Sequence, residues 1–359
     1  MITGNIGEWS ELYALFKILS DGELAAGDQD LNKINNLIYP VIKILRMESN
    51  ENFEFTPIVD SPNIEIKKAN ETFIIPTADF AAMAEYLLLE LKKKHSSASF
   101  SIPLIEEFIQ KYKSNKIKAK SSSKSDIKII IYDSKLGITP ELGFSIKSRL
   151  GKASTLLNAG KTTNFVYLIN DLNISDQKIE ELNSLPLKNR VQEIKKLGGN
   201  LQFSHLCNGI FQNNLILIDS LLPEIMAHAL VEFYSTKSTA LSLIVRELNN
   251  KNPLNYILDN QHPFYEFKIK KLLCETAIGM MPNTVWTGNN IDSTGGYLII
   301  KQDGEIVCYH LYHRQEFEEY LYQNTRFETA STSRYEFGNL FKDDNGQLSI
   351  ILNLQIRFK

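Results

Sequence analysis

The sequence predicts an α/β protein in which helices flank a mixed central sheet, followed by a helical support and a C-terminal β-hairpin region. Two apolar runs rich in β-branched residues, at 127–132 and 142–148, are typical of paired strands. The apolar period of residues 7–20 predicts an amphipathic helix. Asp303-Gly304 and Asn345-Gly346 are turn dipeptides that predict hairpins near the end of the chain.

Length and composition indicate two ordered domains. The chain has 359 residues, of which 43% are hydrophobic and 10% aromatic. We expect one domain at residues 1–215, with the central sheet and the N-terminal helices, and another at 216–359. No secretory leader and no apolar run near the ~18 residues of a membrane span are visible. Three widely spaced cysteines favour a reduced, cytosolic protein.

The predicted helix over residues 7–20 carries two acidic residues of interest. Its apolar stripe is wide, so most of its circumference should be buried. Glu11 lies on the edge of that stripe, where a carboxylate must be paired or must bind a cation; both alternatives remain open. Glu8 lies in the first turn, where acidic side chains are favoured by the helix dipole.

Several further segments before the central strands have local patterns of their own. We expect a helix interrupted near Pro40 over residues 31–46, strand-like runs at 64–66 and 73–75, and helices at 78–94 and 103–112.

The two central strands bring together residues suited to phosphodiester chemistry. Asp126 opens the first strand, and Ser145 and Lys147 share one face of the second because side chains alternate along a strand. Antiparallel pairing would place Asp126 near Lys147. An aspartate could then bind a divalent metal, and the lysine could stabilise the attacking water or the developing charge. The alternative is an ordinary hairpin with solvated charges.

The charge distribution favours an anionic partner. Residues 110–165 contain twelve Lys/Arg and three Asp/Glu, a net +9, which leaves −12 for the rest of a chain whose total is −3. A basic strip on an acidic protein can bind DNA phosphates at one site while limiting loose binding elsewhere. A solvated, flexible linker at 111–124 is the alternative for the first part of this strip.

The C-terminal half alternates helices with hairpins. We expect helices near 189–197, 223–234, 239–248, 264–280 and 315–322, a strand near 201–203, and hairpin strands at 296–302 and 305–311. The polar segment 324–334 contains two arginines and several hydroxyls, which suit guanine edges and phosphates. An ordinary polar surface loop is the alternative.

Two other patterns are weaker. Residues 159–163 (AGKTT) are similar to the end of a P-loop, but Thr155 stands where the pattern requires a glycine. Cys308 and His310 lack a second pair of residues at metal-ligand spacing. Neither pattern supports an NTPase or a zinc site.

Long stretches of the chain resemble the HpaII-type restriction endonucleases. They are GEWSELY (7–13), SSSKSDI (121–127), LGFSIKSRLGKASTLLNAGKTTNF (142–165), NPLNY (252–256), HPFYEFKIK (262–270), TGGYLIIKQDG (294–304) and NTRFETASTSRYEFG (324–338). The resemblance implies a bacterial, cytoplasmic enzyme with a restriction-endonuclease-like core that cleaves duplex DNA at CCGG with Mg²⁺. It also implies a companion cytosine methyltransferase.

The resemblance gives roles to the central residues. It implies that Asp126 binds metal, that Lys147 is catalytic, and that Ser145 replaces the acid of the Asp…(Asp/Glu)-x-Lys superfamily. One metal ligand must then come from elsewhere: Glu11 is the candidate and Glu8 the reserve. Asp133 and Glu141 are weaker candidates beside turns, and the main-chain carbonyl of Ile146 could complete the metal shell.

Residues of the polar segment and residues after the second central strand are the candidates for DNA binding. Arg326 and Arg334 are expected to read bases, followed by Arg149 and Asn158, and phosphates are expected at Ser331, Thr332 and Ser333. A two-fold dimer would match a palindromic site, and a monomer that nicks twice is the alternative. Because Ser145 replaces an acid, a DNA-binding protein without cleavage remains an alternative, as does a structure-specific repair nuclease.

Overall fold

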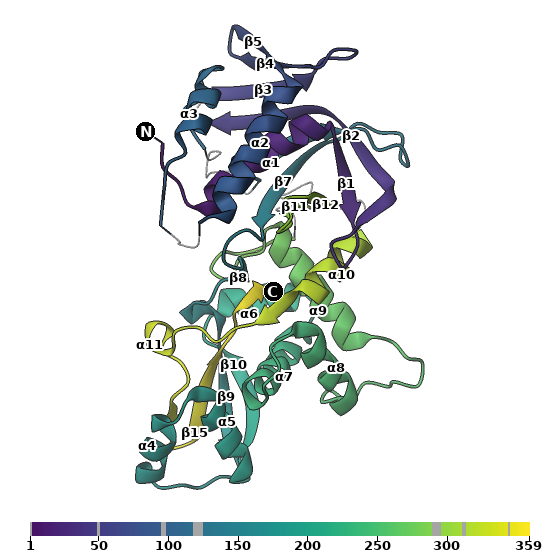
Figure 1. Cartoon of the computed structure of the whole chain (residues 1–359). Helices are drawn as coiled ribbons and strands as arrows, with labels where there is room; N and C mark the ends of the chain where they lie inside the picture. The colour runs from purple at the N-terminus through teal and green to yellow at the C-terminus, as the bar shows by residue number, and fades with distance from the viewer. Residues whose placement is uncertain are drawn as a thin grey trace. The chain divides into compact units, whose positions relative to one another are not determined.

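The computed structural model describes residues 2–48, 51–94, 98–117, 125–288, 296–310, 314–343 and 345–359, and Figure 1 draws the chain. The chain forms two compact units. The first comprises Met1–Ser154 and Ile291–Tyr320, and the second Thr155–Asn290 and Leu321–Lys359. This division differs from the expected boundary at residue 215. The units are discontinuous because a late hairpin extends the first sheet, whereas residues 155–215 fold with the C-terminal strands.

The first unit is built on a nine-stranded sheet in the order β1-β12-β11-β7-β6-β2-β3-β4-β5. The strands are β1 (Glu23–Gly27), β2 (Lys33–Glu48), β3 (Glu51–Pro57), β4 (Asn63–Lys68), β5 (Glu71–Pro76), β6 (Ile127–Ile131), β7 (Glu141–Ser148), β11 (Gly296–Ile300) and β12 (Ile306–His310). The sheet is mixed, as predicted: β11 runs parallel to β7 and β12 parallel to β1, whereas the other pairs are antiparallel.

The described residues of this unit also form the helices α1 (Ile6–Asp21), α2 (Thr77–Lys92), α3 (Pro103–Gln110) and the first part of α10 (Arg314–Asn324). They confirm the four helices predicted in these regions. Asn5 and Glu8 form a capping box at the start of α1, and Gly22 ends it with φ 70°. α1 packs along α2 and contacts β7, which brings the helix to the central strands (Figure 1).

The prediction of a helix over residues 31–46 is wrong. The segment is the long strand β2, in which Leu37, Tyr39 and Val41 are buried and alternate with exposed Ile38 and Ile42. Apolar residues lie on both faces of this strand, so their spacing in the sequence was mistaken for that of a helix. The period-2 burial and the β-branched residues favour a strand. The register of β2 against β6 shifts between Val41 and Lys43, just after Pro40.

The predicted hairpins are confirmed. β6 and β7 pair antiparallel, with Ile127 opposite Phe144. β11 and β12 pair around the turn that contains Gly304, whose φ of 101° is one that glycine adopts without strain. The strand-like runs at 64–66 and 73–75 lie in β4 and β5. Part of the expected linker, residues 118–124, lies outside the described residues.

The second unit contains two smaller sheets, all the other described helices and the end of α10. Its sheets have the orders β10-β9-β15-β14 and β13-β16-β8. Its strands are β8 (Thr155–Leu157), β9 (Asn164–Asn170), β10 (Asn200–Leu206), β13 (Thr325–Phe327), β14 (Leu340–Lys342), β15 (Leu348–Asn353) and β16 (Ile356–Phe358). Its helices are α4 (Asp176–Ser184), α5 (Leu187–Lys196), α6 (Gly209–Ile218), α7 (Leu222–Ser235), α8 (Leu241–Lys251), α9 (Phe264–Ile278) and α11 (Thr332–Tyr335), with the 3₁₀ turn η1 (Lys161–Thr163).

The second unit confirms most of the local predictions made for it. α5, α7, α8 and α9 match the four helices predicted there, β10 includes the predicted strand, and β14 and β15 form the hairpin. The expected helical support is therefore present, but it includes a four-stranded sheet. η1 leads into strand β9 rather than into a helix, so residues 159–163 lack the context of a P-loop.

A buried ion pair on β2 makes hydrogen bonds to residues 114–116, which precede β6 in the chain. Arg46 and Glu48 on β2 lie 2.8 Å apart, with side chains 2% and 3% exposed. Burial raises the pKa of Glu48, and the Arg46 charge and a hydrogen bond from Ser114 oppose that rise. Arg46 also donates to the carbonyl of Lys116.

We expect Glu48→Ala to lower the free energy of unfolding by about 3–5 kcal/mol, because it leaves the Arg46 charge buried without its carboxylate. Urea unfolding followed by circular dichroism measures this change. Glu141→Ala is the control, because it breaks the exposed Lys128–Glu141 pair and should cost less than about 1 kcal/mol. Equal losses in the two variants would contradict the role given to the buried pair.

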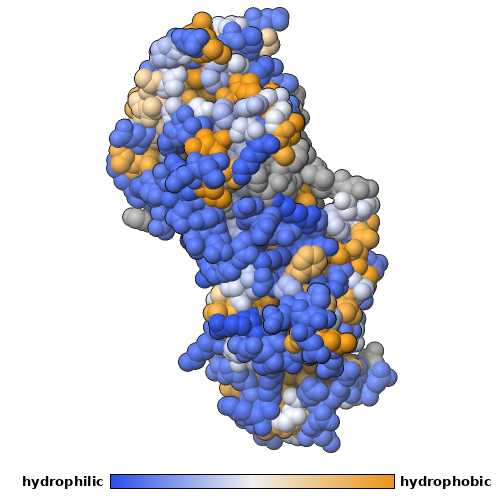
Figure 2. Space-filling model, turned by 90° about the vertical axis from the view of Figure 1, so that its right-hand side faces the viewer, coloured by the Kyte–Doolittle hydropathy of each residue, from blue (hydrophilic) through white to orange (hydrophobic). Residues whose placement is uncertain are grey.

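The surface in Figure 2 is mainly hydrophilic, with hydrophobic residues in small scattered groups. Among the described helices, none alone is long and apolar enough to cross a membrane. α6 and α7 pass that test only together, as a pair bent by 107°.

Candidate active site

β6 and β7 bring Asp126, Ser145 and Lys147 together. The main-chain N–H of Asp126 donates to the carbonyl of Phe144 at 2.8 Å, which continues the β6–β7 ladder by one residue. Asp126 Oδ2 accepts the N–H of Ile146 at 2.7 Å and lies 3.3 Å from Ser145 Oγ. Lys147 Nζ donates to the same Ser145 Oγ at 3.0 Å. Ser145 thus connects the carboxylate of one strand to the ammonium of the next.

Helix α1 contacts β7, the strand that carries Ser145 and Lys147. Ser10 Oγ lies 2.9 Å from Ser148 Oγ, and this contact joins α1 to the end of β7. Glu11, the next residue, is half-buried, and its negative charge acts on Lys147. The carboxylates of Glu11 and Asp126 are therefore both close enough to influence the same lysine.

The Lys147 side chain is surrounded by groups that affect its charge and its position. Burial lowers its pKa from the usual lysine value, whereas the charges of Asp126 and Glu11 act to raise it. Its Nζ lies 5.1 Å from the centre of the Tyr297 ring on the neighbouring strand β11. The ammonium is thus fixed among an aromatic face, a hydroxyl and two acidic groups.

The other acidic candidates have structural roles. Glu8 accepts the N–H of Asn5 at 2.9 Å and completes the capping box of α1. Asp133 is buried and accepts the N–H groups of Lys135 and Leu136 in the turn after β6. Glu141 forms an exposed ion pair with Lys128. Their assignment to a metal remains a prediction, and so does that of Glu11, which differs from the three in that its charge acts on Lys147.

The donor set near Lys147 fits a hard divalent cation. Asp126, Glu11, the Ser145 hydroxyl and the Ile146 carbonyl would all offer oxygen, which Mg²⁺ prefers. Within the described ranges, no group of three or more His, Cys, Asp or Glu side chains is placed to hold a metal. Two carboxylates are compatible with Mg²⁺, which usually keeps several waters.

The expected DNA-binding residues lie in both units. Arg149 follows β7 in the first unit, and its N–H donates to the carbonyl of Ile300. Asn158 is exposed just after β8 in the second unit. The short helix α11 contains Thr332, Ser333 and Arg334. Ser331 caps its start. Arg334 stacks on Tyr335, with its guanidinium carbon 5.3 Å from the ring centre.

Arg326 has an unexpected neighbour. β13 and β16 pair so that Arg326 lies opposite Arg357, and Glu328 accepts from both guanidinium groups, at 3.0 and 2.9 Å. On the other side of β16, Arg357 pairs with Thr155 of β8. Sequence reasoning missed Arg357. Its alternation with Ile356 and Phe358 could have indicated a strand, but the pairing with residue 326 is a tertiary feature.

Carboxylates that could hold a divalent metal and a lysine that could stabilise phosphate charge are chemical groups suited to phosphodiester hydrolysis. The sequence model of the HpaII restriction endonuclease family matches residues 5–358. The type II restriction enzyme HpaII of Haemophilus parainfluenzae is 46% identical over 357 residues, which cover 99% of this chain and 98% of that enzyme. No solved structure matches the chain.

The chain therefore belongs to the HpaII restriction endonuclease family. It is a type II restriction enzyme, a site-specific deoxyribonuclease that acts on phosphodiester bonds. DNA is its substrate.

Proposed function

We propose that this restriction enzyme cleaves duplex DNA at CCGG by Mg²⁺-dependent hydrolysis and leaves 5′-phosphate and 3′-hydroxyl ends. The observation that carries the proposed chemistry is the hydrogen-bonded series Asp126–Ser145–Lys147 with Glu11 beside it. The CCGG site follows from the family resemblance of the sequence. Family membership favours this function over a DNA-binding protein that does not cut and over a repair nuclease.

Asp126 and Glu11 are the proposed metal ligands, and the Ile146 carbonyl is a further candidate. When bound, Mg²⁺ would lower the pKa of a water ligand and stabilise negative charge on the phosphate. Ser145 holds both Asp126 and Lys147 in place, so a hydroxyl can replace the superfamily acid as a positioning group. Lys147 would place its ammonium beside the attacked phosphate, where charge increases as the water oxygen bonds to phosphorus.

The paired arginines Arg326 and Arg357 are the proposed guanine readers. A guanidinium can bond guanine O6 and N7 together, which contributes about 1–3 kcal/mol of discrimination. Glu328 holds the two groups on adjacent strands, so their orientation is restricted before DNA binds. The residues at α11 are proposed to contact phosphates, with Arg334 as an alternative base reader.

We expect Arg326→Ala to reduce discrimination at one G·C pair by about 1–3 kcal/mol, with the other pairs of the site still recognised. Cleavage rates on duplexes with each base pair replaced in turn measure this selectivity. Lys342→Ala, which removes an exposed cation of the same unit that pairs with Asp176, is the control. Unchanged selectivity in Arg326→Ala would exclude this residue as a reader and leave Arg357 and Arg334 as the candidates.

A cognate cytosine methyltransferase is the proposed functional partner, because the host must protect its own CCGG sites. The palindromic site suits a two-fold dimer, and a monomer that cuts each strand in turn is the alternative.

Digestion of a plasmid of known sequence, with and without Mg²⁺, tests the proposed function. We expect fragment ends at every CCGG, none without metal, and protection after CpG methylation. Mapped ends at another sequence would refute the proposed site, and cleavage with the metal chelated would refute the proposed chemistry.

A further inference from the structure

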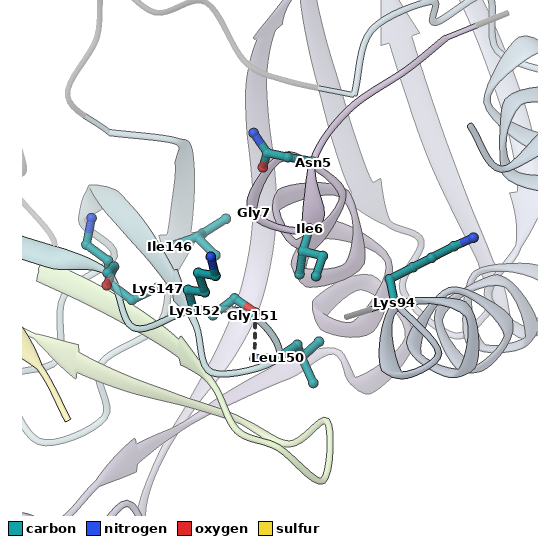
Figure 3. A pocket seen from close by; sticks show the side chains of 11 residues that line it. Asn5, Ile6, Gly7, Lys94, Ile146, Lys147, Leu150, Gly151 and Lys152 are labelled. Atoms are coloured by element: carbon teal, nitrogen blue, oxygen red, sulfur yellow. Dashed lines mark hydrogen bonds between the residues drawn. The ribbon is translucent and has the colours of Figure 1, made fainter. Parts of the chain in front are cut away.

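A cavity of about 560 Å³ opens beside Lys147, between the start of α1 and the turn that follows β7. Ile6, Ile146 and Leu150 give it an apolar lining, and Asn5, Lys147 and Lys152 provide polar groups. Figure 3 shows these side chains around the first turn of α1. The cavity therefore shares the proposed catalytic lysine but extends beyond the Asp126–Ser145–Lys147 series.

The cavity carries cationic side chains. The described residues that line it include Lys94, Lys147 and Lys152 and no acidic residue, whereas Asp126 and Glu11 act on Lys147 from outside the lining. In Figure 3, Lys152 lies between Lys147 and the first residues of α1, whereas Lys94 extends from the opposite side with its amine directed away from Ile6. In the described parts of the chain, no carboxylate forms an ion pair with the exposed Lys152. Lys152 is thus the cation best placed to bind an anion next to Lys147.

Two glycines line the cavity beside α1. Gly151 packs so tightly on α1 that a Cβ atom there would lie 3.2 Å from Ile6 Cγ2. Gly7 forms part of the wall on the α1 side, also without a side chain. The result is a space with an apolar wall and a cationic group beside it. A deoxyribose with its phosphate has the matching character, an apolar ring face attached to an anion.

We propose that this cavity binds a sugar–phosphate unit of the DNA backbone next to the phosphate that is cleaved, with Lys152 as the phosphate-binding residue. The sugar would pack on Ile6 and Leu150. The assignment rests on the proposed active site, because Lys147 is the group that both sites share. Lys152 would fix the position of the strand on the enzyme and would carry no information about base sequence.

The test is DNA binding at several salt concentrations, measured by fluorescence anisotropy without divalent metal so that no strand is cut. The probes are a CCGG duplex and an unrelated duplex of the same length. Lys152→Ala should weaken binding of both about tenfold, the effect of losing one hydrogen bond to a charged group. The slope of log affinity against log salt should become shallower by about 0.9, the value for one phosphate contact.

Two variants complete the experiment. Lys152→Arg should restore affinity and slope, because it keeps the charge. Lys67→Ala removes an exposed lysine of β4, three strands from β6 in the sheet, and should change neither. A wild-type slope in Lys152→Ala would overturn the proposal, and so would a loss confined to the CCGG duplex, which indicates base reading. Failure of the proposed active site would appear separately, as normal cleavage by a Lys147→Ala enzyme.

Discussion

Replacing Lys147 by alanine should reduce the cleavage rate of bound DNA by about 100- to 1,000-fold, the usual effect of removing one group that stabilises transition-state charge. The ammonium is fixed by Ser145 and by the Tyr297 ring, so a flexible surface lysine could not replace it. Single-turnover cleavage of a CCGG duplex with enzyme in excess measures the rate after binding. Binding itself should weaken only about tenfold, because one cationic contact is lost.

Two variants separate this effect from a general loss of charge. Lys147→Arg keeps the charge but replaces a compact ammonium by a planar guanidinium that does not fit the same contacts, so its rate should also fall. Lys67→Ala, which removes a distant exposed lysine, should cleave at the normal rate. A Lys147→Ala enzyme with the wild-type single-turnover rate would exclude Lys147 from catalysis.

Glu11→Gln should lower the cleavage rate by about 100-fold and should raise the Mg²⁺ concentration needed for half-maximal activity. Loss of a proposed ligand weakens metal binding, and the metal contributes several kcal/mol to transition-state stabilisation. Titration of Mg²⁺ in the single-turnover assay measures both quantities. The shape of Gln is nearly that of Glu, so the packing of α1 should be preserved.

Glu8→Gln is the matched control, because the same exchange is made one turn earlier on the same helix. Gln serves in a capping box as Glu does, so stability and metal requirement should both stay close to wild type. If the metal requirement changed in Glu8→Gln and not in Glu11→Gln, the ligand assignment would have to be reversed.

Local sequence signals predicted much of the architecture. α1 has a cap residue at its start, a wide apolar stripe and a glycine at its end, and each of these acts within a few residues. The hairpin turns at Gly304 and Gly346 require positive φ, which glycine adopts at low cost. The alternation of side chains along a strand is also a local property, so the sequence of β7 alone predicted that Ser145 and Lys147 lie on one face.

The features that the sequence did not predict depend on contacts between residues that are far apart in the chain. β2 has apolar residues on both faces, and its alternation of buried and exposed side chains becomes clear only once it pairs with β1, β3 and β6. The boundary of the first unit depends on the parallel pairing of β11 with β7, which joins residues about 150 positions apart. The Arg326–Arg357 pair and the cavity at Lys152 likewise depend on tertiary contacts between segments that have no mutual sequence signal.

The central claim is that Asp126 and Glu11 are the metal-binding acids beside Lys147, with Glu11 supplying the acid that Ser145 replaces, and direct measurement of metal binding tests this claim most sharply. Mn²⁺ can substitute as a paramagnetic probe, and its binding to the enzyme with a CCGG duplex can be followed by electron paramagnetic resonance. We expect tight binding in the wild type, strong weakening in both Asp126→Asn and Glu11→Gln, and no change in Glu8→Gln. Wild-type Mn²⁺ binding in Glu11→Gln would contradict the claim, and the second metal ligand would then have to be another residue.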